Sequence, residues 1–317
     1  MKKILICDHF SKQTYTGLQD KGYEVLQAKS LTPTQNEIKE VHGLLIRSRT
    51  VIDQTLLDSA KKLKLILSAT AGFDHIDYKI CQERNICVMH TPLANVQSAT
   101  ELTLALMLSQ LRSMTQVHTN LVQTKAWRDQ APRGHTLHNK SVGIVGLGRI
   151  GMTVANLCKA FGANVLYYDP YVNSNEFKKV TEFKELLKQS KIVSLHVPLT
   201  QKTKKLIGCE ELNLMTKNGL LVNCSRGEVI DQKALVDFMN IHSEFKVALD
   251  VFNQEPCKDT KLLGLDPQFL GTPHIGAYTH EALENASSEA VQKLLNFFEF
   301  EQISDPVPPH AAWTKDL

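Results

Sequence analysis

Three ionisable side chains in the last third of the sequence are suited to acid–base chemistry on a carbonyl carbon. Arg226 lies at the end of an apolar run that is typical of a β-strand, and Glu255 lies in the loop after a second run that ends at Asp250. His274 lies in a third such segment, between a proline and an isoleucine. A guanidinium can hold a carboxylate through two parallel hydrogen bonds and polarise the carbonyl beside it. An imidazole exchanges a proton near neutral pH, and a carboxylate hydrogen-bonded to it fixes its tautomer and raises its pKa. These are the groups that the reduction of a 2-oxo acid requires.

Each of these side chains also has a purely structural explanation. Arg226 precedes Gly227 and could be a surface arginine in a turn. Glu255 precedes Pro256 and could be solvated, and His274 could be a loop histidine. Spacing alone does not show that the three meet. A doubly wound parallel sheet would bring them together, because ligands bind there outside the carboxyl ends of the strands.

A glycine-rich turn is the clearest binding motif. The expected strand over residues 141–145 is followed by Gly146-Leu147-Gly148-Arg149-Ile150-Gly151, and a helical segment comes next. The first glycine permits a tight turn, the second lets the backbone approach a pyrophosphate, and the third allows close helix–strand packing. The helix N-terminus offers free N–H groups to phosphates. The motif alone is also compatible with a plain strand–turn–helix. We expect a dinucleotide at Gly146, Gly148, Arg149, Ile150 and Gly151.

An acidic residue at the end of the next expected strand indicates which dinucleotide. Asp169 follows the strand expected over residues 165–168, close to the offset of about 20 residues at which such an acid binds the adenosine ribose. A carboxylate accepts hydrogen bonds from both ribose hydroxyls and repels a 2′-phosphate. No arginine or lysine occurs from Pro170 to Phe177. The sequence therefore predicts NAD rather than NADP, although Asp169 taken alone could be a turn starter.

The composition is that of an ordinary globular protein. The chain has 317 residues, of which 43% are hydrophobic and 22% charged, and its net charge is +3. This balance argues against a dedicated nucleic-acid binder, and no apolar run is long enough to span a membrane. Seven cysteines without a C-x-x-C pair favour a reduced, cytoplasmic compartment. The histidines show no metal-ligand spacing, so we expect no metal site.

Short β-branched runs alternate with helical segments in two successive series. This pattern predicts an α/β fold with two doubly wound parallel sheets, divided near residues 90–100. Between the series we expect a long helix that begins at Ser98, because Ser98 and Glu101 have capping-box spacing. A loop over residues 125–140 follows it, and a helix over residues 281–300 lies near the end of the chain.

The motifs in their order and spacing resemble the D-isomer-specific 2-hydroxyacid dehydrogenases. The resemblance rests on GLGRIG with Asp169, NCSRGEVID, ALDVFNQEP and TPHIGAYT. It extends over nearly the whole chain through RSRT, ATAGFDHID, TPLANVQSATE and LHVPLT. The resemblance implies a Rossmann NAD-binding domain over residues 96–285. It also implies a flavodoxin-like substrate domain over residues 1–95 plus about 286–317, with a cleft between the domains.

The resemblance also implies roles for individual residues. Arg226, Glu255 and His274 match the family's catalytic residues, and Asp250 matches the aspartate that binds the nicotinamide carboxamide. The cofactor would also lie along His196, Cys224 and Gly276, at the first two largely through backbone atoms. The substrate carboxylate would lie in the backbone of Ala71, Gly72 and Phe73, with Arg47 and Ser48 bordering the substrate. The family further implies a homodimer, in contact through the long helix after Ser98 and the loop that holds Trp127. Trp127 could equally be an anchor in the core of its own chain.

Several positions depart from the family's usual pattern. Lys191 stands where members often carry aspartate, and Ala99-Thr100 where they often carry Val-Ala. Neither position touches the expected chemistry. Cys224 has no partner that would make it a nucleophile, so a small buried residue is the better interpretation.

Among members of the family, the phosphoglycerate dehydrogenases are the first expectation, and other substrates stay open. Arg47, Ser48 and Arg49 could face a phosphate, as in the phosphoglycerate dehydrogenases, which this chain also resembles through HIGAYTHEA. Strand alternation makes it plausible that one of the two arginines is merely solvated. Hydroxypyruvate and glyoxylate reductases share almost all of these motifs. The sequence ends at Leu317, so we expect no C-terminal regulatory domain.

A binding protein is the alternative from another class. Some relatives of this fold are NAD-sensing co-repressors that bind partner peptides. Arg226, Glu255 and His274 favour the enzyme over this alternative, but they do not exclude it.

Overall fold

The chain folds into two compact units, described here by a computed structural model of residues 1–317. The first unit comprises Met1–Asn95 with Tyr278–Thr314, and the second Val96–Ala277 with Lys315–Leu317. The sequence placed the return to the first unit near residue 286, whereas the structure places it at Tyr278. The reason is that the whole of helix α12 (His280–Phe300) belongs to the first unit, where Ala286, Ala290 and Leu294 enter its core.

The first unit is built on a five-stranded sheet in which every neighbouring pair of strands is parallel. The strands are β1 (Lys3–Ile6), β2 (Glu24–Gln27), β3 (Gly43–Ile46), β4 (Leu65–Ser68) and β5 (Cys87–His90). Their order is β2-β1-β3-β4-β5, the flavodoxin-like order. The helices between them are α1 (Lys12–Gln19), α2 (Gln35–Ile38), α3 (Gln54–Leu57) and α4 (Tyr78–Glu83).

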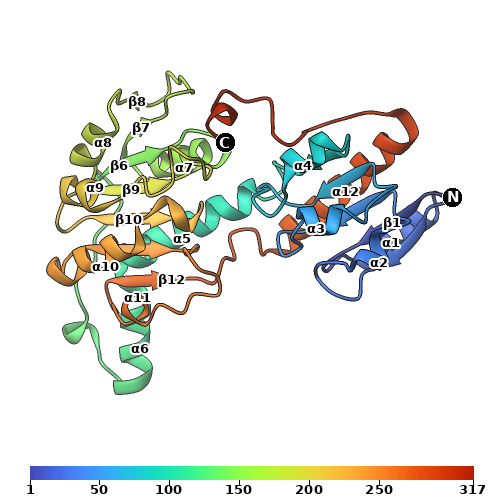
Figure 1. The fold of residues 1–317 in the computed structure, drawn as a ribbon. Coiled ribbons are helices and arrows are strands. Elements are labelled where there is room, and N and C mark those ends of the chain that lie inside the picture. The colour runs from blue at the N-terminus through green and yellow to red at the C-terminus, as the bar shows by residue number, and fades with distance from the viewer. The chain divides into compact units, whose positions relative to one another are not determined.

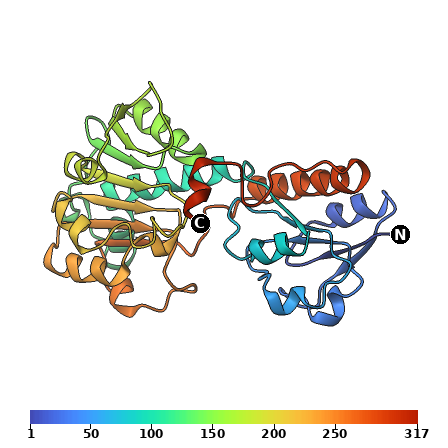
Figure 2. The same cartoon turned by 45° about the horizontal axis from the view of Figure 1, so that its top comes forward.

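Both faces of this sheet are buried, as expected for parallel strands covered by helices. On one face Ile4, Ile6 and Leu67 pack against Leu18 of α1 and against α12. Their chain neighbours on the other face, such as Leu5 and Ile66, are fully buried as well. Figure 2 shows α12 across the first face and the shorter helices α2 to α4 on the second.

The second unit has a seven-stranded parallel sheet in the order β12-β11-β10-β9-β6-β7-β8, which Figure 1 shows from bottom to top. Its strands are β6 (Ser141–Val145), β7 (Asn164–Tyr168), β8 (Lys178–Lys179), β9 (Ile192–Leu195), β10 (Leu220–Asn223), β11 (Lys246–Leu249) and β12 (Phe269–Gly271). The order contains the 3-2-1-4-5-6 arrangement of the Rossmann fold with one further strand. The predicted α/β class with two doubly wound parallel sheets is therefore confirmed.

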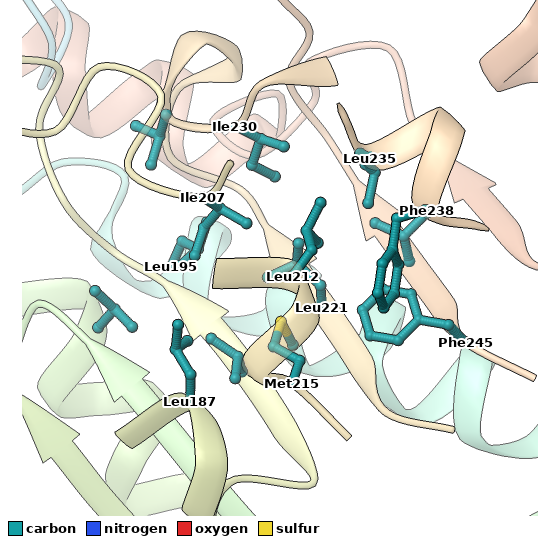
Figure 3. Packing of buried hydrophobic residues seen from close by; sticks show 14 of the residues in the cluster. Leu187, Leu195, Ile207, Leu212, Met215, Leu221, Ile230, Leu235, Phe238 and Phe245 are labelled. Carbon is teal, nitrogen blue, oxygen red and sulfur yellow. The ribbon is translucent and has the colours of Figure 1, made fainter. Parts of the chain in front are cut away.

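Helices cover the second sheet on both faces. They are α5 (Val96–Arg112), α6 (Met114–Thr124), α7 (Arg149–Ala160), α8 (Phe183–Gln189), α9 (Cys209–Leu214), α10 (Gln232–Ile241) and α11 (Thr260–Leu263). Helices α5 and α7 pack on one face, around Met107, Val154 and Ile144. Helices α8, α9 and α10 bury the other face, where Leu187, Leu212 and Leu235 surround Leu221 of β10 (Figure 3).

The helix between the two series differs from its expected form. It begins at Val96, so Ser98 lies inside the helix and does not cap it. A serine followed by a glutamate three residues later has the same appearance inside a helix as at its start. The helix ends at Arg112, and α6 begins after Ser113, whose φ is +48°. No helix in the chain has the length and apolar character needed to cross a membrane.

Phe245 provides a test of the core of the second unit. Its ring is fully buried and meets that of Phe238 edge to face, at 5.0 Å between centroids (Figure 3). We expect Phe245→Ala to lower the free energy of unfolding by about 3–5 kcal/mol, because the truncation leaves a cavity. Urea denaturation measures this. Ile241→Ala, at a side chain that is 77% exposed, is the matched control and should change the stability little.

Candidate active site

The glycine-rich turn lies where the strand order of the second sheet reverses. β6 stands between β7 and β9, and the turn follows its carboxyl end. Gly146 has φ +88°, which confirms the expected tight turn, and a Cβ there would approach the carbonyl oxygen of His196 to 2.5 Å. A Cβ on Gly151 would collide with the carbonyl oxygen of Gly146. The first turn of α7 can therefore lie directly against the end of β6 only because both residues are glycines.

The start of α7 fits a dinucleotide pyrophosphate. The N–H groups of Gly148, Arg149 and Ile150 donate to no acceptor in the chain, and no side chain caps the helix. Open space surrounds the position of a Cβ on Gly148. A phosphate can bind here because the N–H groups have no acceptor, the helix dipole has its positive end here, and nothing blocks the approach.

Asp169 lies beside this turn at the end of β7. One carboxylate oxygen accepts from the N–H of Leu147 at 2.8 Å, and the other from the N–H groups of Tyr171 and Val172 at 2.8 and 2.9 Å. The side chain is therefore fixed against the glycine-rich turn by three backbone donors. Each oxygen has two lone-pair directions, so acceptor capacity remains for a ribose hydroxyl.

His196 and Cys224 follow the ends of β9 and β10. Burial lowers the pKa of His196 to about 4, so its imidazole is neutral at pH 7, and its Nε2 lies 2.9 Å from Ser194 Oγ. Burial raises the pKa of the Cys224 thiol to about 12. A thiol with that pKa is no nucleophile at neutral pH, which agrees with the expectation of a structural residue.

Asp250 organises the loop that carries the candidate histidine. It follows β11 and is 1% exposed. Its Oδ1 accepts from Thr272 Oγ at 2.6 Å and from the N–H of Ile275 at 2.8 Å, and its Oδ2 accepts from the N–H of Gly276 at 2.8 Å. Burial raises the pKa of Asp250 in spite of these hydrogen bonds. The carboxylate thereby holds the segment after β12 from both sides of His274.

His274 and Glu255 form a hydrogen-bonded pair. His274 Nδ1 lies 2.7 Å from Glu255 Oε2, and Glu255 Oε1 accepts from the N–H of Phe252 at 3.1 Å. The hydrogen bond to Glu255 is the largest influence on His274 and raises its pKa above the ordinary value. Burial works to raise the pKa of Glu255, but the hydrogen bond and charge of His274 outweigh it and lower that pKa. Because Nδ1 is engaged, Nε2 is the nitrogen left to exchange a proton with a ligand.

Arg226 lies close enough to act on this pair. Its positive charge lowers the pKa of Glu255 and opposes the rise in the pKa of His274. The loop is set by Asn223, whose amide donates to the carbonyl of Arg226 at 2.8 Å. A Cβ on Gly227 would collide with the backbone of Phe252, so a glycine is needed for the two loops to touch. The structure thus brings the three sequence-predicted residues to one edge of the second sheet.

The candidate carboxylate loop lies in the first unit, directly after β4. The N–H groups of Ala71, Gly72 and Phe73 donate to no acceptor in the chain. Their carbonyls are fixed, since Thr70 Oγ donates to Gly72 at 2.7 Å and His90 Nδ1 lies 2.8 Å from the oxygen of Ala71. Consecutive N–H groups without an acceptor form a concavity that can bind an anion.

An aromatic contact of this loop was not found from the sequence. Phe73 stacks on Trp313 with 6.4 Å between centroids and an interplanar angle of 17°, and Tyr78 and His90 meet its ring edge-on. Trp313 is one of only two tryptophans, which is the one signal that could have drawn attention to it. Trp127, the other, is 72% exposed, so it is not a core anchor of its own chain.

The arginines after β3 are already engaged within the first unit. Arg47 donates to the carbonyl of His9 at 3.0 Å, to that of Leu283 at 3.0 Å and to Ser287 Oγ at 2.7 Å. Arg49 forms a two-point ion pair with the buried carboxylate of Asp8. Ser48 between them is exposed. Three consecutive polar residues therefore have three different environments.

Comparison with known proteins places this arrangement in a family. Residues 104–276 match the family model described as D-isomer specific 2-hydroxyacid dehydrogenase, NAD binding domain. The chain is 39% identical over 305 residues to a D-3-phosphoglycerate dehydrogenase of Methanocaldococcus jannaschii, covering 93% of this chain and 58% of that protein. It is 36% identical over 261 residues to a hydroxypyruvate reductase of Thermotoga maritima, covering 81% and 85%.

Solved structures show the same similarity. A D-lactate dehydrogenase of Aquifex aeolicus, in complex with NAD and lactic acid, superimposes with a TM-score of 0.87 at 30% identity over 96% of this chain and 98% of its own. The chain thus spans little more than half the length of its phosphoglycerate dehydrogenase relatives. It covers nearly the whole chain of the D-lactate dehydrogenase structure. With its matched NAD-binding domain and its similarity to full-length relatives, the chain belongs to the D-isomer specific 2-hydroxyacid dehydrogenase family.

Proposed function

We propose that this chain is an NAD-dependent dehydrogenase that interconverts a small 2-hydroxy acid and its 2-oxo acid. The observation that carries the proposal is the His274–Glu255 hydrogen bond, with the charge of Arg226 acting on both, at the edge of the sheet that holds the glycine-rich turn. NAD, when bound at that turn, supplies the hydride acceptor or donor.

The residues of the chain have separate tasks in this proposal. Arg226 holds the substrate carboxylate and polarises the neighbouring carbonyl. His274 Nε2 gives a proton to the substrate oxygen in reduction and takes it back in oxidation. Glu255 fixes the tautomer of His274 and stabilises the imidazolium, as the raised pKa of His274 indicates. Asp250 positions the loop and contributes to the nicotinamide site, together with Gly276.

We expect His274→Gln to lower turnover about a hundredfold or more, because the proton donor is lost. Reduction of a 2-oxo acid, followed by NADH absorbance, measures this. Binding of NADH, followed by fluorescence, should persist. Turnover equal to that of the unmodified protein would remove His274 from the mechanism.

Glu255→Gln is the matched variant, since it keeps the imidazole and removes only the charge beside it. Reduction needs protonated His274, whose pKa is raised. The rate of reduction is therefore highest below that pKa and falls as the pH rises through it. Without the carboxylate the pKa of His274 falls, so this loss should move to lower pH, and the rise of the oxidising reaction should move with it.

For the substrate we propose 3-phosphoglycerate and its oxo acid. Support comes from the relatives of that name, at up to 39% identity. Arg47 has four oxygen partners, on His9, Ala69, Leu283 and Ser287. The Arg49 side chain, by contrast, is 55% exposed and uses only Nε and Nη2 on Asp8. Its remaining N–H groups would meet the phosphate, while the N–H groups of Ala71 to Phe73 bind the carboxylate.

Hydroxypyruvate is the second candidate substrate. Arg47 and Arg49 both bind partners inside the first unit, and hydroxypyruvate has no phosphate that either would have to contact. The hydroxypyruvate reductase of Thermotoga maritima supports it as well, since the chain covers 85% of that protein.

A substrate panel distinguishes these candidates. We expect phosphohydroxypyruvate to give a higher kcat/KM than hydroxypyruvate, glyoxylate or pyruvate. We also expect Arg49→Lys, which keeps a charge beside Asp8 but loses the planar fork, to raise KM for the phosphorylated substrate alone. A preference for hydroxypyruvate that Arg49→Lys leaves unchanged would favour the second candidate. No turnover with any of them would favour the co-repressor-like binding protein.

We further propose a homodimer formed through α6 and the Trp127 loop. Helix α6 contributes no residue to the core and projects from the second unit in Figure 1. Leu121 and Val122 are 45% and 65% exposed, and Leu121 and Trp127 line an apolar cavity of about 300 Å³. Exposed apolar groups gathered in this way are typical of an interface.

Light scattering after size exclusion should give twice the chain mass of 35.6 kDa. Leu121→Asp with Val122→Asp should shift the protein to a monomer, because two charges would be buried at the contact. Leu263→Asp, at an exposed residue of α11, is the control and should leave the dimer intact. A monomeric unmodified chain would contradict this proposal.

A further inference from the structure

A second cavity lies at the edge of the second sheet opposite to the glycine-rich turn. It has a volume of about 280 Å³ and is bounded by the amino ends of β9, β10 and β11, by the end of α5 and by residues 132–135. This volume is near the lower end of the range of roughly 300–1,000 Å³ that small-molecule sites occupy. None of the residues assigned to the coenzyme or to the substrate lines it.

The cavity collects positive charge. Its lining includes four cationic side chains, those of Arg133, Lys140, Lys191 and Lys246, whereas Glu244 is its only carboxylate. The whole chain carries a net charge of only +3, so this is a local excess and not a general property of the surface.

Two of the cations have polar partners but no carboxylate within salt-bridge distance. Lys246 Nζ donates to the carbonyl of Gln110 at 2.9 Å and to Ser113 Oγ at 2.8 Å, which fixes it at the end of α5. Lys191 Nζ donates to the side-chain oxygen of Asn218. Neutral oxygens orient these ammonium groups without neutralising them, and each keeps at least one N–H for a ligand.

The other two cations are Arg133 and Lys140. The side chains of both donate to no acceptor in the chain and form no ion pair with it. Arg133 is exposed and Lys140 half-buried, so both can move to meet a ligand.

The pKa shifts of Lys191 and Lys246 also favour a bound anion. Burial lowers the pKa of Lys246. Burial and the charge of Lys140 lower the pKa of Lys191, and the opposing charge of Glu244 does not offset them. The protein therefore disfavours the charged form of two lysines that it nevertheless places side by side with further cations. A bound anion would remove this cost, because it supplies the missing opposite charge.

We propose that this cavity binds a small dianion, such as a phosphate group or a compact dicarboxylate. The four cations line one cavity of about 280 Å³, which favours a small ligand over a polyanionic chain. The binding is independent of the dehydrogenase reaction, since no residue is shared with that site.

The test titrates inorganic phosphate, by calorimetry, into the full chain saturated with NADH, so that the N-terminus of α7 is not the site observed. Arg133→Gln with Lys140→Gln removes the two cations that have no hydrogen-bond or ion-pair partner in the chain, at one exposed and one half-buried position. Lys191→Asp reverses one charge within the cavity. Lys61→Asp, at an exposed lysine of the first unit, is the matched charge reversal outside it.

We expect measurable phosphate binding that weakens about tenfold or more in both cavity variants, because each loses charged hydrogen bonds. Lys61→Asp should bind phosphate like the unmodified chain, and turnover should stay unchanged in all variants. Absence of phosphate binding would overturn the proposal, as would equal affinity in all proteins. A change from dimer to monomer in the Arg133→Gln, Lys140→Gln variant would also overturn it and assign these cations to a contact between copies.

Discussion

The buried carboxylate of Asp250 is the constraint on which the candidate active site depends. It accepts three hydrogen bonds from residues on both sides of His274, and the N–H of His274 donates to the carbonyl of Asp250 itself at 2.8 Å. These bonds hold His274 at φ +53°, a conformation that a non-glycine residue adopts at a cost of about 1 kcal/mol or more. A free loop would relax this backbone, and the imidazole would turn away from Glu255. The buried carboxylate of Asp250 thus fixes the geometry of the neighbouring His274.

Close backbone contacts complete the site. Gly146 and Gly151 let α7 begin against the end of β6, and Gly227 lets the Arg226 loop lie on the loop before Glu255. None of these glycines does chemistry. They let the segments that carry the candidate site residues lie close together. A methyl group at any of these glycines would push the segments apart without changing a candidate residue.

Much of this could be predicted from the sequence, because the signals are local. The alternation of strands and helices, the turn after β6 and the acid after β7 all follow from residue type and spacing. The environments of Arg47 and Arg49 could not, since spacing does not show whether a guanidinium meets backbone carbonyls or a buried carboxylate. The stacking of Trp313 on Phe73 joins residues 240 positions apart, and the start of α5 at Val96 puts Ser98 inside the helix. These outcomes are decided by tertiary contacts, which leave no local pattern.

The stacking of Trp313 on Phe73 also makes the candidate carboxylate loop accessible to spectroscopy. The two indoles of the chain have contrasting surroundings, one mostly in solvent at Trp127 and one against an aromatic ring. Indole emission responds to the polarity and packing of its neighbours. A chain that retains only Trp313 would therefore carry an intrinsic optical reporter next to Phe73, and ordering of the loop around an oxo acid could be followed without any added label.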